Sequence, residues 1–252
     1  MKILAFANQK GGVGKTTSAI NVAASLGHLG KKVLLIDLDP QGNCTSGVGI
    51  DKDKAPYSTY DVLLEGISIS EATQKTPYQG LWCVPATMNL AGAEIGLSAV
   101  NGRESVLKKA LDQVSGYDYV IMDCPPSLGL LTLNGLCAAK GVIVPMQCEY
   151  FALEGLSQLT YTIGLVKKMY NPELELAGVI LTMYDGRLNL SLAVAAEIRK
   201  YFPDRIFRTT VPRNVRLSEA PSHGKPVLYY DKNSKGALAY LEIARELMKK
   251  RG

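Results

Sequence analysis

A glycine-rich segment near the start of the chain contains residue types that bind a phosphate chain. It reads Gly11-Gly12-Val13-Gly14-Lys15-Thr16-Thr17 and follows a short apolar run. Glycine lets the main chain curl until backbone N–H groups surround a phosphate, and a helix that begins there adds positive potential. Lys15 would reach the outer phosphates and the Thr16 hydroxyl would coordinate Mg²⁺. These residues predict a nucleotide site rather than a plain glycine-rich turn.

Acidic residues follow two further apolar runs. Asp37 and Asp39 flank Leu38, and Asp123 ends the run Ile121-Met122 before a proline pair. Carboxylates at such positions hold metal-bound water or orient the water that attacks a γ-phosphate. Asp123 is therefore expected to anchor Mg²⁺ through water. The alternative is that Asp37 and Asp39 only cap the turn after their strand.

The elements that must position these residues alternate between strands and helices. This alternation predicts an α/β fold with a mostly parallel, twisted sheet flanked by helices on both faces, and ligands outside the carboxyl ends of the strands. Strand order does not follow from the pattern. Strands are expected at 3–7, 33–38, 81–85, 119–124, 141–146, 176–183 and 206–211, and helices at 17–29, 59–64, 70–73, 103–114, 130–139, 153–169, 192–201 and 237–250. No stretch resembles a linker, so residues 1–252 are expected to form a single domain.

Composition excludes several classes of protein. The chain has 252 residues and a net charge of +5, with no apolar run near the ~20 residues that span a bilayer. Its beginning lacks the pattern of a signal peptide. The 5 cysteines are scattered without a CxxC pair, which predicts reduced, packed thiols in a cytoplasmic protein. With only 2 histidines, a histidine-based metal site is not expected.

The charge is distributed unevenly along the chain. Residues 1–184 contain 14 Lys and Arg against 16 Asp and Glu, whereas residues 185–252 contain 14 against 7. The last quarter therefore has a net charge of +7, which suggests either an anionic partner or a solvated basic surface.

The phosphate loop departs from the general pattern because a second lysine, Lys10, stands at its head. In this respect it resembles the deviant phosphate loop (deviant Walker A) of the ParA/MinD/NifH group of ATPases. That resemblance implies that Lys10 reaches across a dimer interface to the nucleotide of the other subunit. Taken alone, Lys10 could equally be a solvated loop charge.

Further motifs extend the resemblance over nearly the full length. ANQKGGVGKTT, LIDLDPQGN, MDCPPSLG, LTMYDGR and PRNVRLSEAPSHGKP occur in this order, and together they resemble the ParA/Soj-type chromosome-partitioning ATPases. The resemblance implies a P-loop NTPase that hydrolyses ATP with Mg²⁺, forms an ATP-dependent homodimer and binds duplex DNA without sequence preference. It also implies a ParB-type partner that stimulates hydrolysis, a cytoplasmic and nucleoid-associated location, and no stable membrane association; it allows a role towards the replication initiator.

The resemblance also assigns site residues. Catalysis is expected from Lys10, Lys15 and Asp39, with Asp39 orienting the water and Asp37 supporting it. Mg²⁺ is expected directly on Thr16, and through water on Asp39 and Asp123. Nucleotide contacts are expected from Lys10, Gly11, Gly12, Val13, Gly14, Lys15, Thr16, Thr17, Asp123, Pro212 and Asn214, and DNA contacts from Arg187, Arg213, Arg216 and Lys225. Arg213 has a competing assignment, because it lies between the two residues expected to contact adenine.

Three alternatives accompany this assignment. A MinD-like membrane-cycling ATPase would use an amphipathic helix at the carboxyl end, but the apolar stripe Leu241, Ala244, Leu247 and Met248 is more typical of packing on the protein's own sheet. A nitrogenase-reductase-like protein would need cysteines arranged for a cluster. A DNA-binding scaffold would bind ATP without hydrolysing it, which the presence of Asp39 and Asp123 disfavours.

Overall fold

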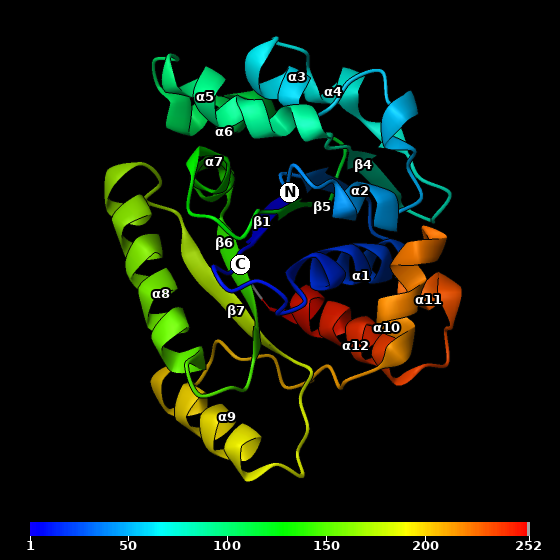
Figure 1. The fold of residues 1–252 in the computed structure, drawn as a ribbon, viewed down its shortest axis with the longest axis vertical. Helices are drawn as coiled ribbons and strands as arrows, with labels where there is room; N and C mark the ends of the chain where they lie inside the picture. The colour runs from blue at the N-terminus through cyan, green and yellow to red at the C-terminus, as the bar shows by residue number, and fades with distance from the viewer. Residues whose placement is uncertain (251–252) are drawn as a thin grey trace.

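The computed structural model describes residues 1–250 and contains a seven-stranded sheet in the order β3-β4-β2-β5-β1-β6-β7 (Figure 1). All neighbouring strands are parallel except β3 and β4. This confirms the mostly parallel sheet predicted from the sequence. The strands are β1 (Lys2–Phe6), β2 (Val33–Asp37), β3 (Gln74–Lys75), β4 (Leu81–Val84), β5 (Tyr119–Asp123), β6 (Gly141–Gln147) and β7 (Glu175–Thr182).

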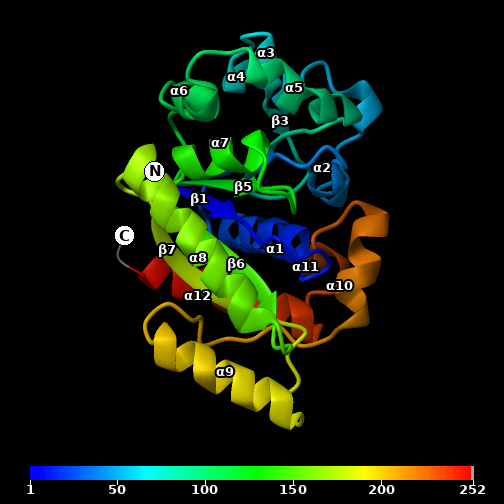
Figure 2. The ribbon, with the colours of Figure 1, turned by 60° about the vertical axis from the view of Figure 1, so that its left-hand side comes forward.

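Helices cover both faces of this sheet, as Figure 2 shows. Along β2, Leu34 and Ile36 face one hydrophobic core while Val33 and Leu35 face the other, because side chains alternate along a strand. The helices are α1 (Lys15–His28), α2 (Asn43–Gly47), α3 (Thr59–Leu64), α4 (Ile69–Ala72), α5 (Ala93–Ser98), α6 (Val106–Leu111), α7 (Leu130–Ala138), α8 (Ala152–Met169), α9 (Asn189–Tyr201), α10 (Val215–Glu219), α11 (Val227–Tyr230) and α12 (Lys235–Lys249).

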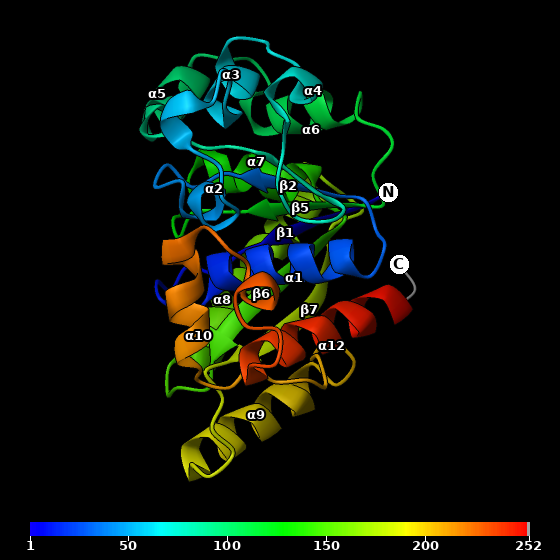
Figure 3. The ribbon, with the colours of Figure 1, turned by 90° about the vertical axis from the view of Figure 1, so that its right-hand side faces the viewer.

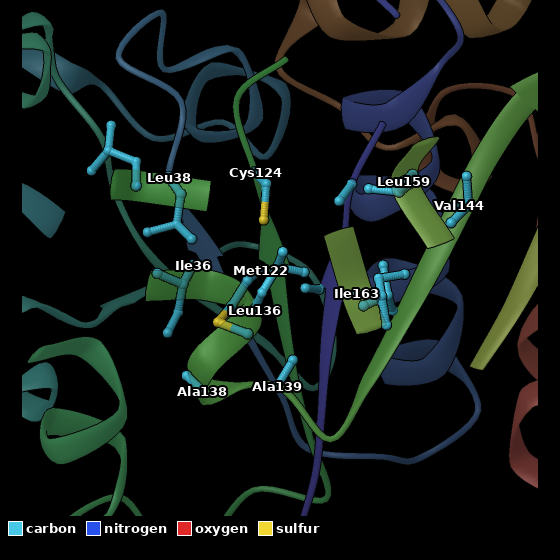
Figure 4. Close-up of a cluster of buried hydrophobic side chains, with 14 of the residues drawn as sticks. Ile36, Leu38, Met122, Cys124, Leu136, Ala138, Ala139, Val144, Leu159 and Ile163 are labelled. Carbon is cyan, nitrogen blue, oxygen red and sulfur yellow. The ribbon is translucent and has the colours of Figure 1, made fainter. Parts of the chain in front are cut away.

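The larger core lies between the sheet and α3 to α9. Figure 4 shows part of it, where Ile36 and Met122 from the strands meet Leu136 of α7 and Ile163 of α8 lies near Val144. The second core packs α1, α11 and α12 on the other face. Burial of both faces explains why the central strands read as continuous apolar runs.

One predicted strand is wrong. The segment 206–211 makes only single parallel bridges, from Ile206 to Val179 and from Pro212 to Tyr184. Between them, the backbone N–H groups of Arg208 and Thr209 donate to the Glu246 carboxylate of α12, each at 2.8 Å. Because the Glu246 side chain accepts these two backbone N–H groups, the segment does not form a continuous ladder of hydrogen bonds with β7. The sequence pattern also did not predict the short β3, nor α2, α5, α10 and α11.

Helix α12 buries its apolar face inside the protein, against α1. The buried face comprises Tyr240, Ile243, Ala244 and Leu247, whereas Met248, predicted in the stripe, is exposed. The helix thus uses its apolar surface for the fold, as the sequence favoured over membrane contact. Among residues 1–250, no helix has the length and apolar character needed to cross a membrane.

Close packing at the end of α1 gives a prediction about stability. A Cβ at Gly27 would lie 2.3 Å from the backbone oxygen of Gln79, which cannot move without displacing the turn at Gly80. We expect Gly27→Ala to lower the free energy of unfolding by about 1–3 kcal/mol through overpacking, as measured by urea denaturation.

The matched control is Gly164→Ala on α8. A Cβ there meets no atom within 4 Å, so the change should raise helix propensity and stabilise the protein by about 0.5–1 kcal/mol. Equal stability of the two variants would contradict this account of Gly27.

Candidate active site

The phosphate loop lies between β1 and α1 and has an open, left-handed backbone. Gly12 and Gly14 have φ angles of 74° and 80°, which only glycine adopts readily. Cβ atoms at Gly11 and Gly12 would meet nothing within 4 Å, so the loop borders free space. Gly14 is the N-cap of α1 and no side chain caps that helix end. The free N–H donors and the helix dipole therefore face a space that suits an anion.

Neighbouring strand ends fix the loop. The Thr182 hydroxyl at the end of β7 donates to the Val13 carbonyl at 2.7 Å, and the Gln147 amide at the end of β6 donates to the Gly12 carbonyl at 2.9 Å. Asn8 donates to the Pro145 carbonyl at 2.8 Å and accepts the Lys10 N–H at 3.0 Å. The sequence analysis did not identify Asn8, Gln147 and Thr182 as residues that hold the loop. Each is a polar residue at or just after the end of an apolar strand, and this pattern could have indicated them.

The parallel register brings the acidic residues to this loop. Phe6, the last residue of β1, and Asp37, the last residue of β2, both pair with Asp123 of β5. The strands therefore end together, and the loop after β1 begins beside the two carboxylates. This juxtaposition agrees with the sequence-based expectation that the acidic residues and the phosphate loop share one sheet edge.

A buried ion pair joins the loop to the sheet. Lys15 Nζ lies 3.2 Å from Asp123 Oδ1, with the side chains 8% and 0% exposed. Burial lowers the pKa of Lys15, but the Asp123 carboxylate outweighs it and the net shift is upward. Burial raises the pKa of Asp123, while Lys15 and the Thr16 hydroxyl hold it down in part. Each group thus offsets part of the cost of burying the other.

One oxygen of this pair lacks a partner. Asp123 Oδ2 is buried without a hydrogen bond in the structure, which is costly for a carboxylate. A hydrated Mg²⁺ would satisfy it, and the nearby Thr16 hydroxyl supplies the kind of oxygen that Mg²⁺ prefers. Among residues 1–250, no three His, Cys, Asp or Glu side chains gather as a metal site, so such an ion needs nucleotide oxygens and water as well.

Asp37 and Asp39 have different environments. Asp37 is fully buried and accepts hydrogen bonds from the Thr45 N–H and hydroxyl and from the Asp39 N–H. Burial and the charge of Asp123 raise the pKa of Asp37 to about 7. Asp39 lies beyond the end of β2, partly exposed, and accepts the Gln41 N–H at 3.0 Å. Asp37 therefore organises the turn, while Asp39 retains an oxygen available to water.

Lys10 lies apart from Lys15. Its ammonium group forms an ion pair with Glu149 in the loop before α8, and about half of each side chain is exposed. It is thus a surface cation of the chain and does not contact Asp123. The structure brings Lys15, Thr16, Asp39 and Asp123 together, and leaves Lys10 on the outer side of the loop.

A cavity of about 590 Å³ lies beside the phosphate loop. It is lined by Gly14 and Thr17 and by Pro212, Arg213 and Asn214, the segment from which the sequence analysis expects the adenine contacts. Asn214 also caps α10 by accepting the Arg216 N–H at 3.0 Å. The remaining lining residues are Thr182, Met183, Val211, Val215, Leu217, Ser218, Pro221 and Tyr240.

The four predicted DNA-contacting residues are all exposed but differ in their partners. Arg187 makes a bidentate pair with Asp185, at 2.9 and 2.7 Å. Arg216 pairs with Glu219 at 2.7 Å and Asp231 at 3.3 Å. Within residues 1–250, Arg213 and Lys225 form no ion pair, so the positive charge of this segment is only partly free.

Cys124 follows Asp123 directly and shares its buried surroundings. Burial raises the pKa of this thiol to about 12, which keeps it neutral and unreactive near pH 7. All five cysteines are free and buried. They pack as small apolar groups, as the sequence predicted.

Comparisons with known proteins agree with this geometry. A family model described as an AAA domain matches residues 1–176. The sporulation initiation inhibitor protein Soj of Bacillus subtilis is 53% identical over 98% of both chains. The chromosome partitioning protein ParA of Myxococcus xanthus is 53% identical over 99% of this chain and 88% of its own.

Among solved structures, a cobyrinic acid a,c-diamide synthase from Mycobacterium smegmatis with bound ATP analogue and magnesium superimposes with a TM-score of 0.85. It is 43% identical over 99% of this chain and 95% of its own. Identity to the Bacillus Soj and Myxococcus ParA proteins is higher over nearly the whole chain. Together with the deviant phosphate loop and its sheet, this places the chain in the ParA/Soj family of chromosome-partitioning ATPases, within the P-loop NTPases.

Proposed function

We propose that residues 1–252 form a single ATPase domain that binds ATP with Mg²⁺, hydrolyses it to ADP and phosphate, and uses this cycle to partition chromosomes. The observation that carries the proposal is the buried Lys15–Asp123 pair with its unpartnered carboxylate oxygen beside an open phosphate loop. The buried ion pair holds Lys15 and Asp123 in fixed positions, which lowers the cost of reorganisation on binding. The similarity to the chromosome partitioning protein ParA of Myxococcus xanthus supports the proposal, as do the magnesium and ATP analogue bound in the Mycobacterium structure.

In the proposed reaction, the loop amides and Lys15 hold the phosphates while Pro212 and Asn214 border the base. Mg²⁺, held by Thr16 directly and by Asp39 and Asp123 through water, would neutralise charge that develops on the phosphates. Asp39 orients the attacking water in line with the bond that breaks. Lys10 leaves Glu149 and reaches the nucleotide of a second copy, so that hydrolysis requires a dimer.

The proposed cycle couples this dimer to DNA. The ATP-bound homodimer binds duplex DNA through Arg187, Arg213, Arg216 and Lys225, because non-specific binding needs only cations that contact phosphates. Pairing two copies doubles the basic surface and raises the affinity through avidity. A ParB-type partner stimulates hydrolysis and resets the cycle. The protein is accordingly cytoplasmic and associated with the nucleoid, with the replication initiator as a further candidate partner.

Replacement of the buried lysine tests nucleotide binding. We expect Lys15→Ala to weaken ATP binding by roughly 30-fold or more, because it removes a buried charge that faces the phosphates. A fluorescent ATP analogue gives the affinity and a melting curve reports folding. Lys32→Ala, which removes an exposed lysine far from the loop, should bind as the unmodified protein does; unchanged binding by Lys15→Ala would refute the assignment.

Replacement of Asp39 separates binding from hydrolysis. We expect Asp39→Ala to retain ATP and to accumulate as a DNA-bound dimer, while phosphate release slows by roughly 100-fold because the water loses its orienting group. Phosphate release, together with sizing in ATP and in ADP, measures both effects. The control Asp53→Ala removes an exposed carboxylate. Unchanged hydrolysis by Asp39→Ala would rule out its role and leave a scaffold that binds ATP only as a ligand.

Removal of two arginines tests the DNA surface. We expect Arg187→Ala/Arg216→Ala to lose DNA retention in ATP, and its slope of log affinity against log salt to fall in magnitude by about 1.8, for two lost phosphate contacts. The control Arg205→Ala/Arg245→Ala removes the same charge from the same quarter of the chain. If both double variants retain DNA equally, the proposed surface is wrong.

A further inference from the structure

Arg216 is held by an acidic network on its own surface. Its guanidinium contacts Glu219 at 2.7 Å and Asp231 at 3.3 Å. The Tyr230 hydroxyl donates to the same Glu219 oxygen at 3.2 Å, which fixes that carboxylate in place. Two carboxylates pair with one guanidinium, so their charges offset the positive charge that Arg216 would present to a phosphate.

The neighbouring cations of the same segment are arranged differently. Arg213 and Lys225 flank Arg216 in the sequence, are exposed and form no ion pair within residues 1–250. Arg213 and Lys225 can therefore contact an anion directly. Arg216 must first give up its contacts with Glu219 and Asp231. An exposed ion pair contributes little to stability, so a small structural change suffices for that exchange.

The helix that carries this cluster also forms a wall of the cavity beside the phosphate loop. Leu217 and Ser218 of α10 line the cavity, directly after Arg216 in the chain. Leu217 also packs against α12, where a Cβ at Gly236 would lie 2.7 Å from its Cγ. Figure 3 shows α10 beside the end of α1, and α10 also contacts α11, the helix that Asp231 follows. A ligand in the cavity thus contacts the element that positions Arg216 and Glu219.

We propose that Glu219 and Asp231 form an acidic clamp that withholds Arg216 from DNA phosphates, and that a nucleotide in the adjoining cavity releases it. The inference rests on the proposed function, since it concerns regulation of the same DNA-binding surface. Glu219 and Asp231 act through Arg216 and are positioning residues. The clamp gives the chain a nucleotide-dependent affinity for DNA in addition to the gain from dimerisation.

The test measures binding to a mixed-sequence DNA duplex with and without ATP, over a series of salt concentrations. We expect Glu219→Gln and Asp231→Asn each to raise the affinity of the nucleotide-free protein by up to about five-fold. The affinity for DNA in the presence of ATP should change little. The ratio of the DNA affinity with ATP to the DNA affinity without ATP should therefore fall. The salt slope without ATP should steepen by about 0.9, the value for one added phosphate contact.

The matched control is Glu242→Gln on α12. Glu242 pairs with Arg245 at 2.9 Å with the same three-residue spacing and similar exposure, so its loss removes the same charge from an equivalent pair outside the clamp. Both clamp substitutions keep an acceptor oxygen, for the Tyr230 hydroxyl in Glu219→Gln and for the Asn233 N–H in Asp231→Asn. If one clamp variant has a lowered melting temperature, the other provides the measurement.

The outcomes separate the two proposals. The clamp is overturned if both clamp variants keep the wild-type ratio of DNA affinities with and without ATP, or if they change this ratio only as much as Glu242→Gln does. ATP-dependent DNA binding would still stand in that case. If Arg216→Ala in the Glu219→Gln background keeps the gain in affinity, the gain does not come from Arg216 and the clamp is again overturned. If the unmodified protein binds DNA equally with and without ATP, the proposed function itself fails.

Discussion

The buried pair of Lys15 and Asp123 is the interaction on which the site depends. Two charges are withdrawn from water at the edge of a sheet, and each is tolerable only because the other is 3.2 Å away. The pair links the first turn of α1 to the end of β5. The pair therefore holds the phosphate loop in place together with the hydrogen bonds from Thr182 and Gln147, and the loop glycines border a space that suits an anion.

The parallel register makes this pair possible. The strands β1, β2 and β5 end at the same level. Phe6 at the end of β1 and Asp37 at the end of β2 therefore both pair with Asp123 at the end of β5. The carboxylates then divide their tasks according to their surroundings. Asp37 is enclosed and hydrogen-bonded to Thr45, whereas Asp39, two residues later, lies outside the ladder and partly in solvent. Burial, more than residue type, separates the structural carboxylate from the proposed catalytic one.

The ion pairs on the outer surface differ from the buried Lys15–Asp123 pair because they are exposed to solvent. Lys10 pairs with Glu149, Arg187 with Asp185 and Arg216 with Glu219 and Asp231. Such pairs are weak and exchange readily. The charges of the proposed nucleotide site are thus held in a buried pair, whereas the surface cations are held in exposed pairs.

The sequence by itself determined the alternation of strands and helices, the phosphate loop and the acidic residues at strand ends, because these depend on local periodicity and on residues close in the chain. Residues 206–211 show its limit: their apolar pattern suits a strand, but Glu246, far along the chain, takes two backbone donors. Only the tertiary structure decided the strand order, the partners of Arg216 and the joining of Thr17 to Pro212 around one cavity. These features arise from contacts between segments distant in sequence, and no local pattern encodes which segments will meet.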